Sequence, residues 1–162
     1  MKFTKRIFLI LIACAITTNI CAIQFRHLSI KDGLSQLSVL SIYQDKLGRM
    51  WFGTEEGINV FDGNNLTAIK TLRNIPPQNL EVRWICGDEK GNIYFQLGTS
   101  IVCIDFATQS NTVLVKKGVT TLCHHSGKIY YASRGSVYIY NIAKQSTHCM
   151  GQLTKDNIKV LH

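Results

Sequence analysis

The sequence lacks the short motifs that usually mark an enzyme. It contains no Gly-x-Ser-x-Gly nucleophile turn, no Gly-x-x-x-x-Gly-Lys phosphate loop and no His-Glu-x-x-His zinc motif. The only adjacent histidines, His124 and His125, would point to opposite faces of a strand and so would not converge on one metal. Glu55 and Glu56 fall in a tight turn that favours solvation over catalytic pairing. We therefore expect no enzymatic activity, no cofactor and no metal site.

Clusters of one charge sign and long apolar runs are also missing. The formal net charge is +8, but lysine and arginine are scattered along the chain. Phosphate binding requires a basic stripe or patch, so we expect no nucleic acid partner for this segment. The apolar run from Ile7 to Ile16 is shorter than the roughly 20 residues that span a bilayer as a helix.

What the sequence does contain is a unit that recurs about every 40 residues. Each copy has a glycine turn, then an aromatic residue, then an apolar residue seven positions on and Asp or Asn eleven positions on. The glycines are Gly48, Gly91 and Gly127; the aromatics are Trp51, Tyr94 and Tyr130; the apolar residues are Ile58, Ile101 and Val137; the last positions are Asp62, Asp105 and Asn141. We take these positions, with Gly53 and Gly57 of the first copy, as structural residues that define the repeat.

Each copy is predicted to form four short strands. In the first copy they cover about residues 39–44, 49–53, 57–61 and 66–71, which are rich in Val, Ile, Tyr, Phe, Trp and Thr. Turn residues such as Asp45, Gly48 and Gly57 separate them. Four strands in some 40 residues is typical of a propeller blade, whose two apolar faces must pack against neighbouring blades. The recurring aromatic is then inter-blade core, with a sugar-stacking platform as the alternative.

The predicted fold is therefore all-β: an incomplete β-propeller of about three four-stranded antiparallel blades in residues 23–162. The blades cover about residues 36–73, 80–115 and 118–150. Residues 154–162 resemble the first strand of a fourth blade, and Phe25–Ile30 reads as an opening strand. Three blades and a strand do not close a ring, so we expect a fragment, a truncated reading frame or a chain awaiting a partner.

Residues 33–62 closely resemble the two-component regulator propeller repeat. The matching positions are Gly33-Leu-Ser35, Ser38-Val39, Asp45, Gly48, Trp51, Gly53-Thr54, Gly57, Ile58, Phe61 and Asp62. The resemblance implies the periplasmic sensor region of a hybrid two-component regulator, anchored in the inner membrane and followed by a histidine kinase. It also implies an oligosaccharide ligand and transcriptional control of glycan-use genes. Expected partners are that ligand, the remaining blades and a second copy of the chain.

Two other functions stay open at this point. The chain could be a secreted propeller binding module or lectin without a signalling role, or, with less support, a propeller lyase or hydrolase.

The second and third copies lack the Gly-Thr turn of the first, having Gln96 and Ala132 where the first has Gly53.

The cysteines do not form an evident disulfide framework. No Cys-x-x-Cys occurs, and Cys86 and Cys123 occupy equivalent first-strand positions of adjacent blades. Stacked sheets lie about 10 Å apart, beyond the roughly 7 Å between Cα atoms that a disulfide tolerates. We expect free, buried cysteines acting as small apolar residues.

The N-terminus has the three-part pattern of a secretory signal. Lys2, Lys5 and Arg6 precede the short apolar run, and Ile20-Cys-Ala22 ends in a small residue. We assign residues 1–22 to a signal peptide; an uncleaved anchor or a buried helix is the alternative. Leu11-Ile-Ala-Cys14 also resembles a lipidation motif, although lipidation at Cys14 would leave a very short apolar region.

Export with cleavage close to Ala22 is the first testable prediction. Mass spectrometry of the periplasmic fraction should find a mature N-terminus near Ile23. A soluble cytoplasmic product that retains Met1 would contradict it.

Overall fold

The computed structural model describes residues 25–69, 80–105, 107–108 and 110–152. These residues form twelve strands in three four-stranded antiparallel sheets, with one short 3-10 helix, η2 (Ile30–Asp32). The all-β class and the three four-stranded sheets predicted from the repeat are thus confirmed. Within the described part of the chain, no helix is long and apolar enough to cross a membrane.

The three sheets follow the order of the chain, and we call them blades 1, 2 and 3. Blade 1 contains β1 (Val39–Gln44), β2 (Met50–Thr54), β3 (Gly57–Phe61) and β4 (Leu66–Ala68). Blade 2 contains β5 (Val82–Gly87), β6 (Ile93–Leu97), β7 (Ser100–Ile104) and β8 (Asn111–Val115). Blade 3 contains β9 (Val119–His125), β10 (Lys128–Ser133), β11 (Ser136–Asn141) and β12 (Ser146–Gln152). In each blade the strands pair in sequence order, so every connection within a blade is a hairpin.

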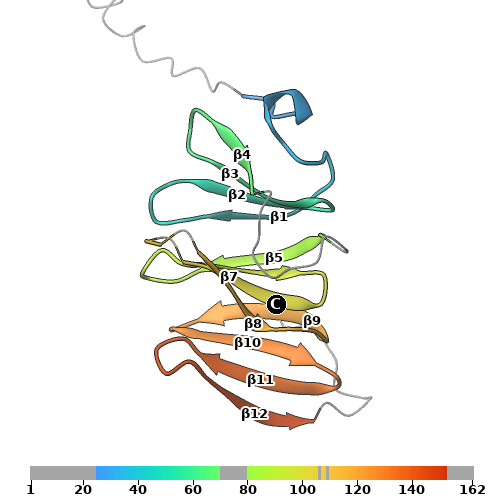
Figure 1. The fold of residues 1–162 in the computed structure, drawn as a ribbon, viewed down its shortest axis with the longest axis vertical. Coiled ribbons are helices and arrows are strands. Elements are labelled where there is room, and N and C mark those ends of the chain that lie inside the picture. The colour runs from blue at the N-terminus through green and yellow to red at the C-terminus, as the bar shows by residue number, and fades with distance from the viewer. Residues whose placement is uncertain (1–24, 70–79, 106, 109, 153–162) are drawn as a thin grey trace, which may run out of the picture.

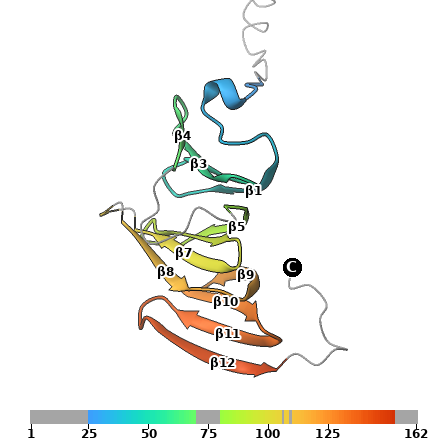
Figure 2. The same ribbon diagram turned by 45° about the vertical axis from the view of Figure 1, so that its right-hand side comes forward.

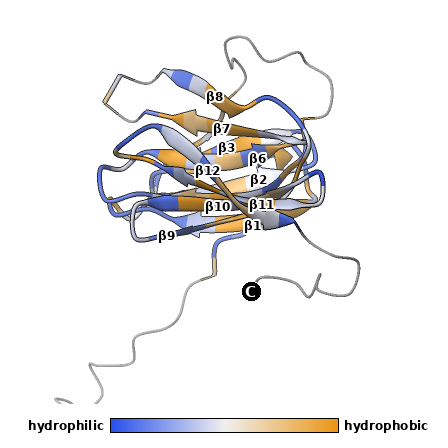
Figure 3. Cartoon of the chain, turned by 90° about the horizontal axis from the view of Figure 1, so that it is seen from below, coloured by the Kyte–Doolittle hydropathy of each residue, from blue (hydrophilic) through white to orange (hydrophobic). Residues whose placement is uncertain are grey.

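The blades stack face to face with blade 2 in the middle (Figures 1 and 2). Their first strands are neighbours, because β5 lies beside both β1 and β9. Viewed along the stack, hydrophobic residues concentrate in the strands and hydrophilic residues in the connecting loops (Figure 3). This is the arrangement expected of sheets that pack face to face.

The three marker aromatics occupy equivalent positions in their blades. Each lies in the second strand, paired on one side with the first strand and on the other with the third. The cross-strand rows are Tyr43–Trp51–Val60, Cys86–Tyr94–Cys103 and Cys123–Tyr130–Ile139. Positions that are equivalent in the sequence repeat are therefore equivalent in the three sheets.

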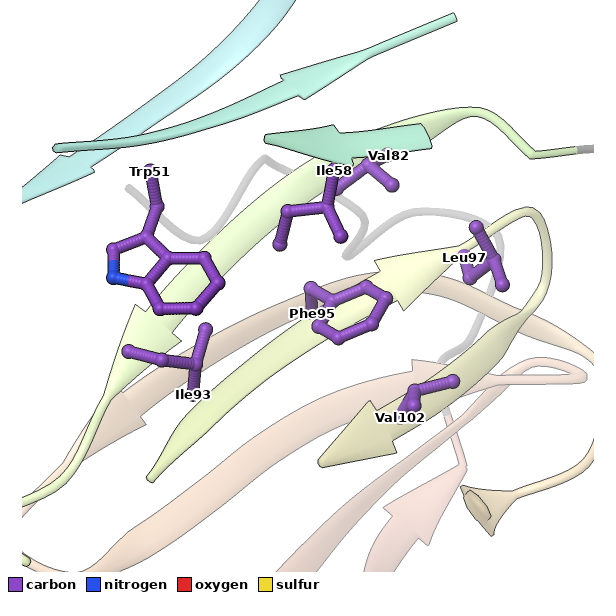
Figure 4. Close-up of a cluster of buried hydrophobic side chains, with 7 residues drawn as sticks. All are labelled: Trp51, Ile58, Val82, Ile93, Phe95, Leu97 and Val102. Atoms are coloured by element: carbon purple, nitrogen blue, oxygen red, sulfur yellow. The ribbon is translucent and has the colours of Figure 1, made fainter. Parts of the chain in front are cut away.

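Blades 1 and 2 share one hydrophobic core. Blade 1 contributes Trp51 and Ile58; the buried residues of blade 2 are Val82, Ile93, Phe95, Leu97 and Val102 (Figure 4). Phe95 and Val82 have no exposed surface, and Trp51 keeps only 3% of its own. Burial of this aromatic between two blades favours the core interpretation over a sugar-stacking platform.

Blades 2 and 3 share a second core on the other face of blade 2. There Tyr94 and Ile101 pack against Val119, Leu122, Ile129 and Tyr131 of blade 3. Side chains alternate between the faces of a strand, so Phe95 faces blade 1 whereas its neighbour Tyr94 faces blade 3. Blade 2 is consequently apolar on both faces.

The outer face of blade 3 includes Val137 and Ile139 but not Ile129 and Tyr131. Ile129 and Tyr131 are buried against blade 2. Strand alternation places Tyr130 on the opposite face, together with its partner Ile139 and with Val137, the partner of Ala132. Tyr130, Val137 and Ile139 are only half-buried.

The opening strand expected at Phe25–Ile30 is also not formed. Residues 25–29 have no regular structure and lead into η2, and Phe25 is almost fully exposed. A local capping box forms instead, in which the Ser29 backbone N–H and hydroxyl both donate to the Asp32 carboxylate. Arg26 donates to the carbonyls of Gly63 and Asn64 and lies over the Phe61 ring.

Several boundaries predicted from the sequence cannot be compared with the structure. The signal peptide at residues 1–22, the fourth-blade strand at 154–162 and residues 70–73 of the first blade lie outside the described residues.

The packing of Trp51 predicts a large effect of its removal. Trp51→Ala should lower the free energy of unfolding by about 3–5 kcal/mol, the usual cost of emptying a buried aromatic site. Urea unfolding followed by circular dichroism measures this loss. Tyr130→Ala, at the same register position but half-buried, is the matched control and should cost less. A cost of Trp51→Ala near zero would instead indicate a surface, ligand-stacking role.

Candidate functional site: the repeated aspartate turns

All hairpins that carry the repeated Asp and Asn residues emerge at one end of the blades. Antiparallel pairing places the loop between first and second strands at the same end as the loop between third and fourth strands. Gly48, Asp62, Gly91, Asp105, Gly127 and Asn141 all lie in these loops or at their edges. We call this the aspartate-turn end, and it is the region where the chain concentrates polar side chains in a repeated geometry.

Asp45 organises the first of these loops. Its Oδ1 atom accepts the backbone N–H groups of Leu47 at 2.9 Å and Arg49 at 3.0 Å. Its Oδ2 atom accepts the Arg49 Nε at 2.7 Å and the indole Nε1 of Trp51 at 2.9 Å. A single carboxylate thus closes the turn, pairs with a cation and holds the core tryptophan.

Asp88 repeats this arrangement in blade 2. Its Oδ1 atom accepts the N–H groups of Lys90 and Asn92 at 2.9 and 3.0 Å. Its Oδ2 atom accepts Asn92 Nδ2 at 2.9 Å and the Tyr94 hydroxyl at 2.8 Å. Trp51 and Tyr94 are therefore equivalent in hydrogen bonding as well as in position, because each ring carries a hydrogen-bond donor that binds the aspartate of its own turn.

The sequence pattern described above includes Asp45 but not Asp88. The signal was nevertheless present, since both aspartates precede a glycine by three residues and the aromatic by six.

Both aspartates are ionised structural groups. Burial raises the pKa of Asp45, but the hydrogen bonds from Trp51 and Arg49 outweigh it and hold the pKa below the ordinary value. Burial likewise opposes ionisation of Asp88, and the hydrogen bonds from Asn92 and Tyr94 reverse its effect and lower the pKa. Burial raises the pKa of Tyr94 far above its usual range, so its hydroxyl stays protonated and donates. Carboxylates of this kind do not serve as general acids near neutral pH.

The outer loops use their Asp and Asn side chains in the same local way. Asp62 Oδ1 accepts the N–H groups of Asn64 and Asn65 at 2.8 and 2.7 Å. Asp105 Oδ1 accepts the N–H of Thr108, and Asn141 Oδ1 accepts that of Lys144. These side chains are bound to the loops in which they lie, as in Asx turns.

Blade 3 departs from the pattern. The loop between β9 and β10 contains only Ser126 and Gly127, both with positive φ (47° and 71°), which is the geometry of a two-residue type I′ hairpin. This shorter loop has no aspartate equivalent to Asp45 or Asp88. Tyr130, which faces away from blade 2, is less buried than Trp51 and Tyr94.

His124 of blade 3 lies beside Tyr94 of blade 2. Its ring stacks on Tyr94 with the centroids 6.5 Å apart and the planes 6° from parallel. Burial lowers the pKa of His124 below its ordinary value. His125 is exposed and pairs with Lys128 at the next position of the strand, so the two histidines diverge. Among the described residues, no group of three or more His, Cys, Asp or Glu side chains is placed to hold a metal ion.

Gly53 and Gly57 lie toward the opposite end of blade 1. A side chain at Gly53 would collide with the Ser41 hydroxyl and the Val82 carbonyl, so glycine allows β2 to approach blade 2 closely. Gly57 follows the β2–β3 turn, where Thr54 Oγ1 accepts the Glu56 N–H and donates to the Gly57 carbonyl. Glu55 is exposed and accepts a hydrogen bond from Gln36.

All four described cysteines are free, as predicted. Cys86 and Cys103 flank Tyr94 in its cross-strand row. Burial raises the pKa of Cys86 to about 12 and that of Cys103 to about 11, so both thiols stay protonated. Cys123 and Cys149 are exposed, so the predicted burial is wrong for these two.

Comparison with known proteins bears on the turn around Asp45. Residues 33–56, which include Asp45, Gly48 and Trp51, match the family model described as two component regulator propeller. The segment that matches this repeat therefore contains the complete aspartate turn of blade 1, from the carboxylate to its tryptophan partner.

Other known proteins are similar to this chain over larger parts. The histidine kinase P4 of Formosa agariphila is 43% identical over 58 residues, which are 36% of this chain and 4% of that protein. The extracellular domain described as belonging to hybrid two component system BT3049 of B. thetaiotaomicron aligns with a TM-score of 0.63 and 23% identity over 82% of this chain. That of BT4673 from the same organism aligns with a TM-score of 0.67 and 14% identity over 80% of this chain. The chain spans 20% and 18% of these two solved domains, and at these identities the likeness establishes the fold.

The hydrogen bond from Tyr94 to Asp88 predicts a pH-dependent cost for its removal. Tyr94→Phe should lower the free energy of unfolding at pH 7 by about 1.5–3 kcal/mol, the usual value for a hydrogen bond to a charged group. The bond favours ionised Asp88, whose folded pKa is lowered, so the stabilisation exists above the unfolded pKa. It is lost as pH falls through the folded pKa.

Urea unfolding at a series of pH values between 7 and 3 tests this prediction. Tyr130→Phe is the matched control, because no aspartate lies at the equivalent position in blade 3, and it should show little cost at any pH. Equal, pH-independent losses in the two variants would contradict the assigned role of Asp88.

Proposed function

We propose that this chain is part of the extracytoplasmic sensor region of a hybrid two-component regulator. In this role the propeller binds an oligosaccharide outside the inner membrane, and the regulator controls transcription of glycan-use genes. The observation that carries the proposal is the repeat at residues 33–56, supported by the 43% identity to a histidine kinase over 58 residues.

The chemistry of the described residues favours binding over catalysis. The carboxylates at the aspartate-turn end are engaged by backbone and side-chain donors of their own loops. The recurring aromatics are core residues where a neighbouring blade covers them. The oligosaccharide ligand itself rests on the resemblance of residues 33–62 to sensor propellers that bind such ligands.

A genetic experiment tests the signalling role. The reading frame that carries this segment is deleted, and transcripts are compared during growth on a panel of purified oligosaccharides. The deletion should abolish induction of at least one glycan-use locus by one oligosaccharide, while growth on simple sugars is unchanged. Calorimetry with the whole extracytoplasmic region should then show binding of that oligosaccharide and not of its monosaccharide units.

Two results would contradict the proposal. Sugar binding with unchanged induction in the deletion strain would indicate a secreted propeller module or lectin. Turnover of the bound oligosaccharide by the purified region would indicate a lyase or hydrolase.

A further inference from the structure

The contact between blades 2 and 3 includes a histidine. Two cross-strand rows of side chains meet in this contact. The row on blade 3 is His124–Ile129–Tyr140. The row on blade 2 is Cys86–Tyr94–Cys103. Burial raises the pKa of the tyrosines and thiols in both rows, so these groups stay protonated. Histidine ordinarily titrates between pH 5 and 8, so His124 is the member of these rows that can change its charge in mild acid.

The surroundings of His124 suit the neutral ring. The side chain is half-buried and stacks on Tyr94, and its Nε2 atom is buried with no hydrogen-bond partner among the described residues. A neutral imidazole carries a hydrogen on only one ring nitrogen, whereas the protonated ring carries N–H groups on both. Protonation would therefore bury an N–H group that has no acceptor, which costs free energy.

Asp88 is the carboxylate whose charge acts on His124, and its acceptor sites are already in use. Its Oδ1 atom accepts two backbone N–H groups of its own loop. Its Oδ2 atom accepts the Asn92 side chain and the Tyr94 hydroxyl. A carboxylate has about four acceptor sites, so Asp88 could bind the protonated ring only by giving up a bond of its turn.

The neutral form of His124 therefore belongs to the folded contact. Burial lowers the pKa of His124, the Asp88 carboxylate raises it by less, and the neighbouring His125 lowers it further. Histidine in the unfolded chain has a pKa of about 6.5, so below this value the unfolded state binds more protons than the folded state. The stabilisation is present above the unfolded pKa and is lost as pH falls toward the folded pKa.

The contact between blades 1 and 2 has a glycine at the equivalent place. Gly87 pairs with Ile93 in blade 2 as His124 pairs with Ile129 in blade 3. The Tyr43 ring of blade 1 lies against this glycine, and a Cβ atom added there would lie 2.6 Å from the Tyr43 hydroxyl. The two contacts thus differ in the group that can titrate in mild acid.

We propose that the contact between blades 2 and 3 is pH-sensitive, and that protonation of His124 loosens it in mild acid while the contact between blades 1 and 2 stays closed. The protonated ring leaves Tyr94 for water, and Cys86, which packs in the same contact, becomes accessible. A contact of this kind couples the geometry of the propeller to the acidity of its surroundings.

Thiol labelling measures the opening at the contact itself. The full chain, produced by secretion, is compared with His124→Phe, which keeps an aromatic ring that cannot be charged. Both are labelled with dithiodipyridine, which reacts with thiols in mild acid, from about pH 7.5 to about pH 5. Peptide mass spectrometry then gives the labelling rate of each cysteine. At the acid end Cys86 should react more than about threefold faster in the native chain than in the variant, with no difference at the neutral end. Asp88 stays ionised over this range because its pKa is lowered.

His125→Phe is the matched control. His125 is exposed and points away from blade 2, so this variant should behave as the native chain does. The exposed Cys149 is the internal reference, and its labelling should be equal in all variants. His124→Gln, which is polar and neutral at every pH, is the second variant, and it should lack the acid-dependent labelling even if His124→Phe does not fold.

Three outcomes would overturn the proposal. Labelling of Cys86 that does not rise in acid in the native chain would show that the contact tolerates a charged His124. An equal rise in the native chain and in the His124 variants would assign the effect to another group. Loss of the rise in His125→Phe would show that overall charge, and not the contact, controls the opening.

Discussion

The packing of one blade against the next is the interaction on which the rest of this structure depends. A four-stranded sheet with apolar side chains on both faces cannot bury either face by itself, so each face needs another sheet against it. Blade 2 satisfies both faces, with Phe95 against blade 1 and Tyr94 against blade 3. This requirement explains the repeat in the sequence, because each blade must present an apolar face to the blade before it and another to the blade after it.

The aspartate turns attach this core to the polar end of the blades. Asp45 and Asp88 each accept backbone N–H groups from the loop and a donor from the buried aromatic. A core side chain is thereby fixed in position by an ionised group at the surface end of the sheet. Blade 3 lacks this element: its loop contains only Ser126 and Gly127, and no aspartate precedes Tyr130 by six residues as Asp45 precedes Trp51. At the contact between blades 2 and 3, His124 stacks on Tyr94.

Local residue patterns determined the strands and turns of this protein. Gly and Asp turns interrupt runs of β-forming residues along blade 1. β1 and β3 accordingly have the predicted bounds, and β2 begins and ends one residue later than predicted. The in-phase aromatics, likewise a property of the chain alone, predicted three equivalent sheets. Only the tertiary structure decided which face of the second strand of blade 3 is buried: Ile129 and Tyr131 face blade 2, and Tyr130 does not. It also decided that Phe25–Ile30 forms no strand and that His124 stacks on Tyr94. The physical reason is that a strand pattern specifies two faces, whereas the cover on each face comes from residues distant in sequence.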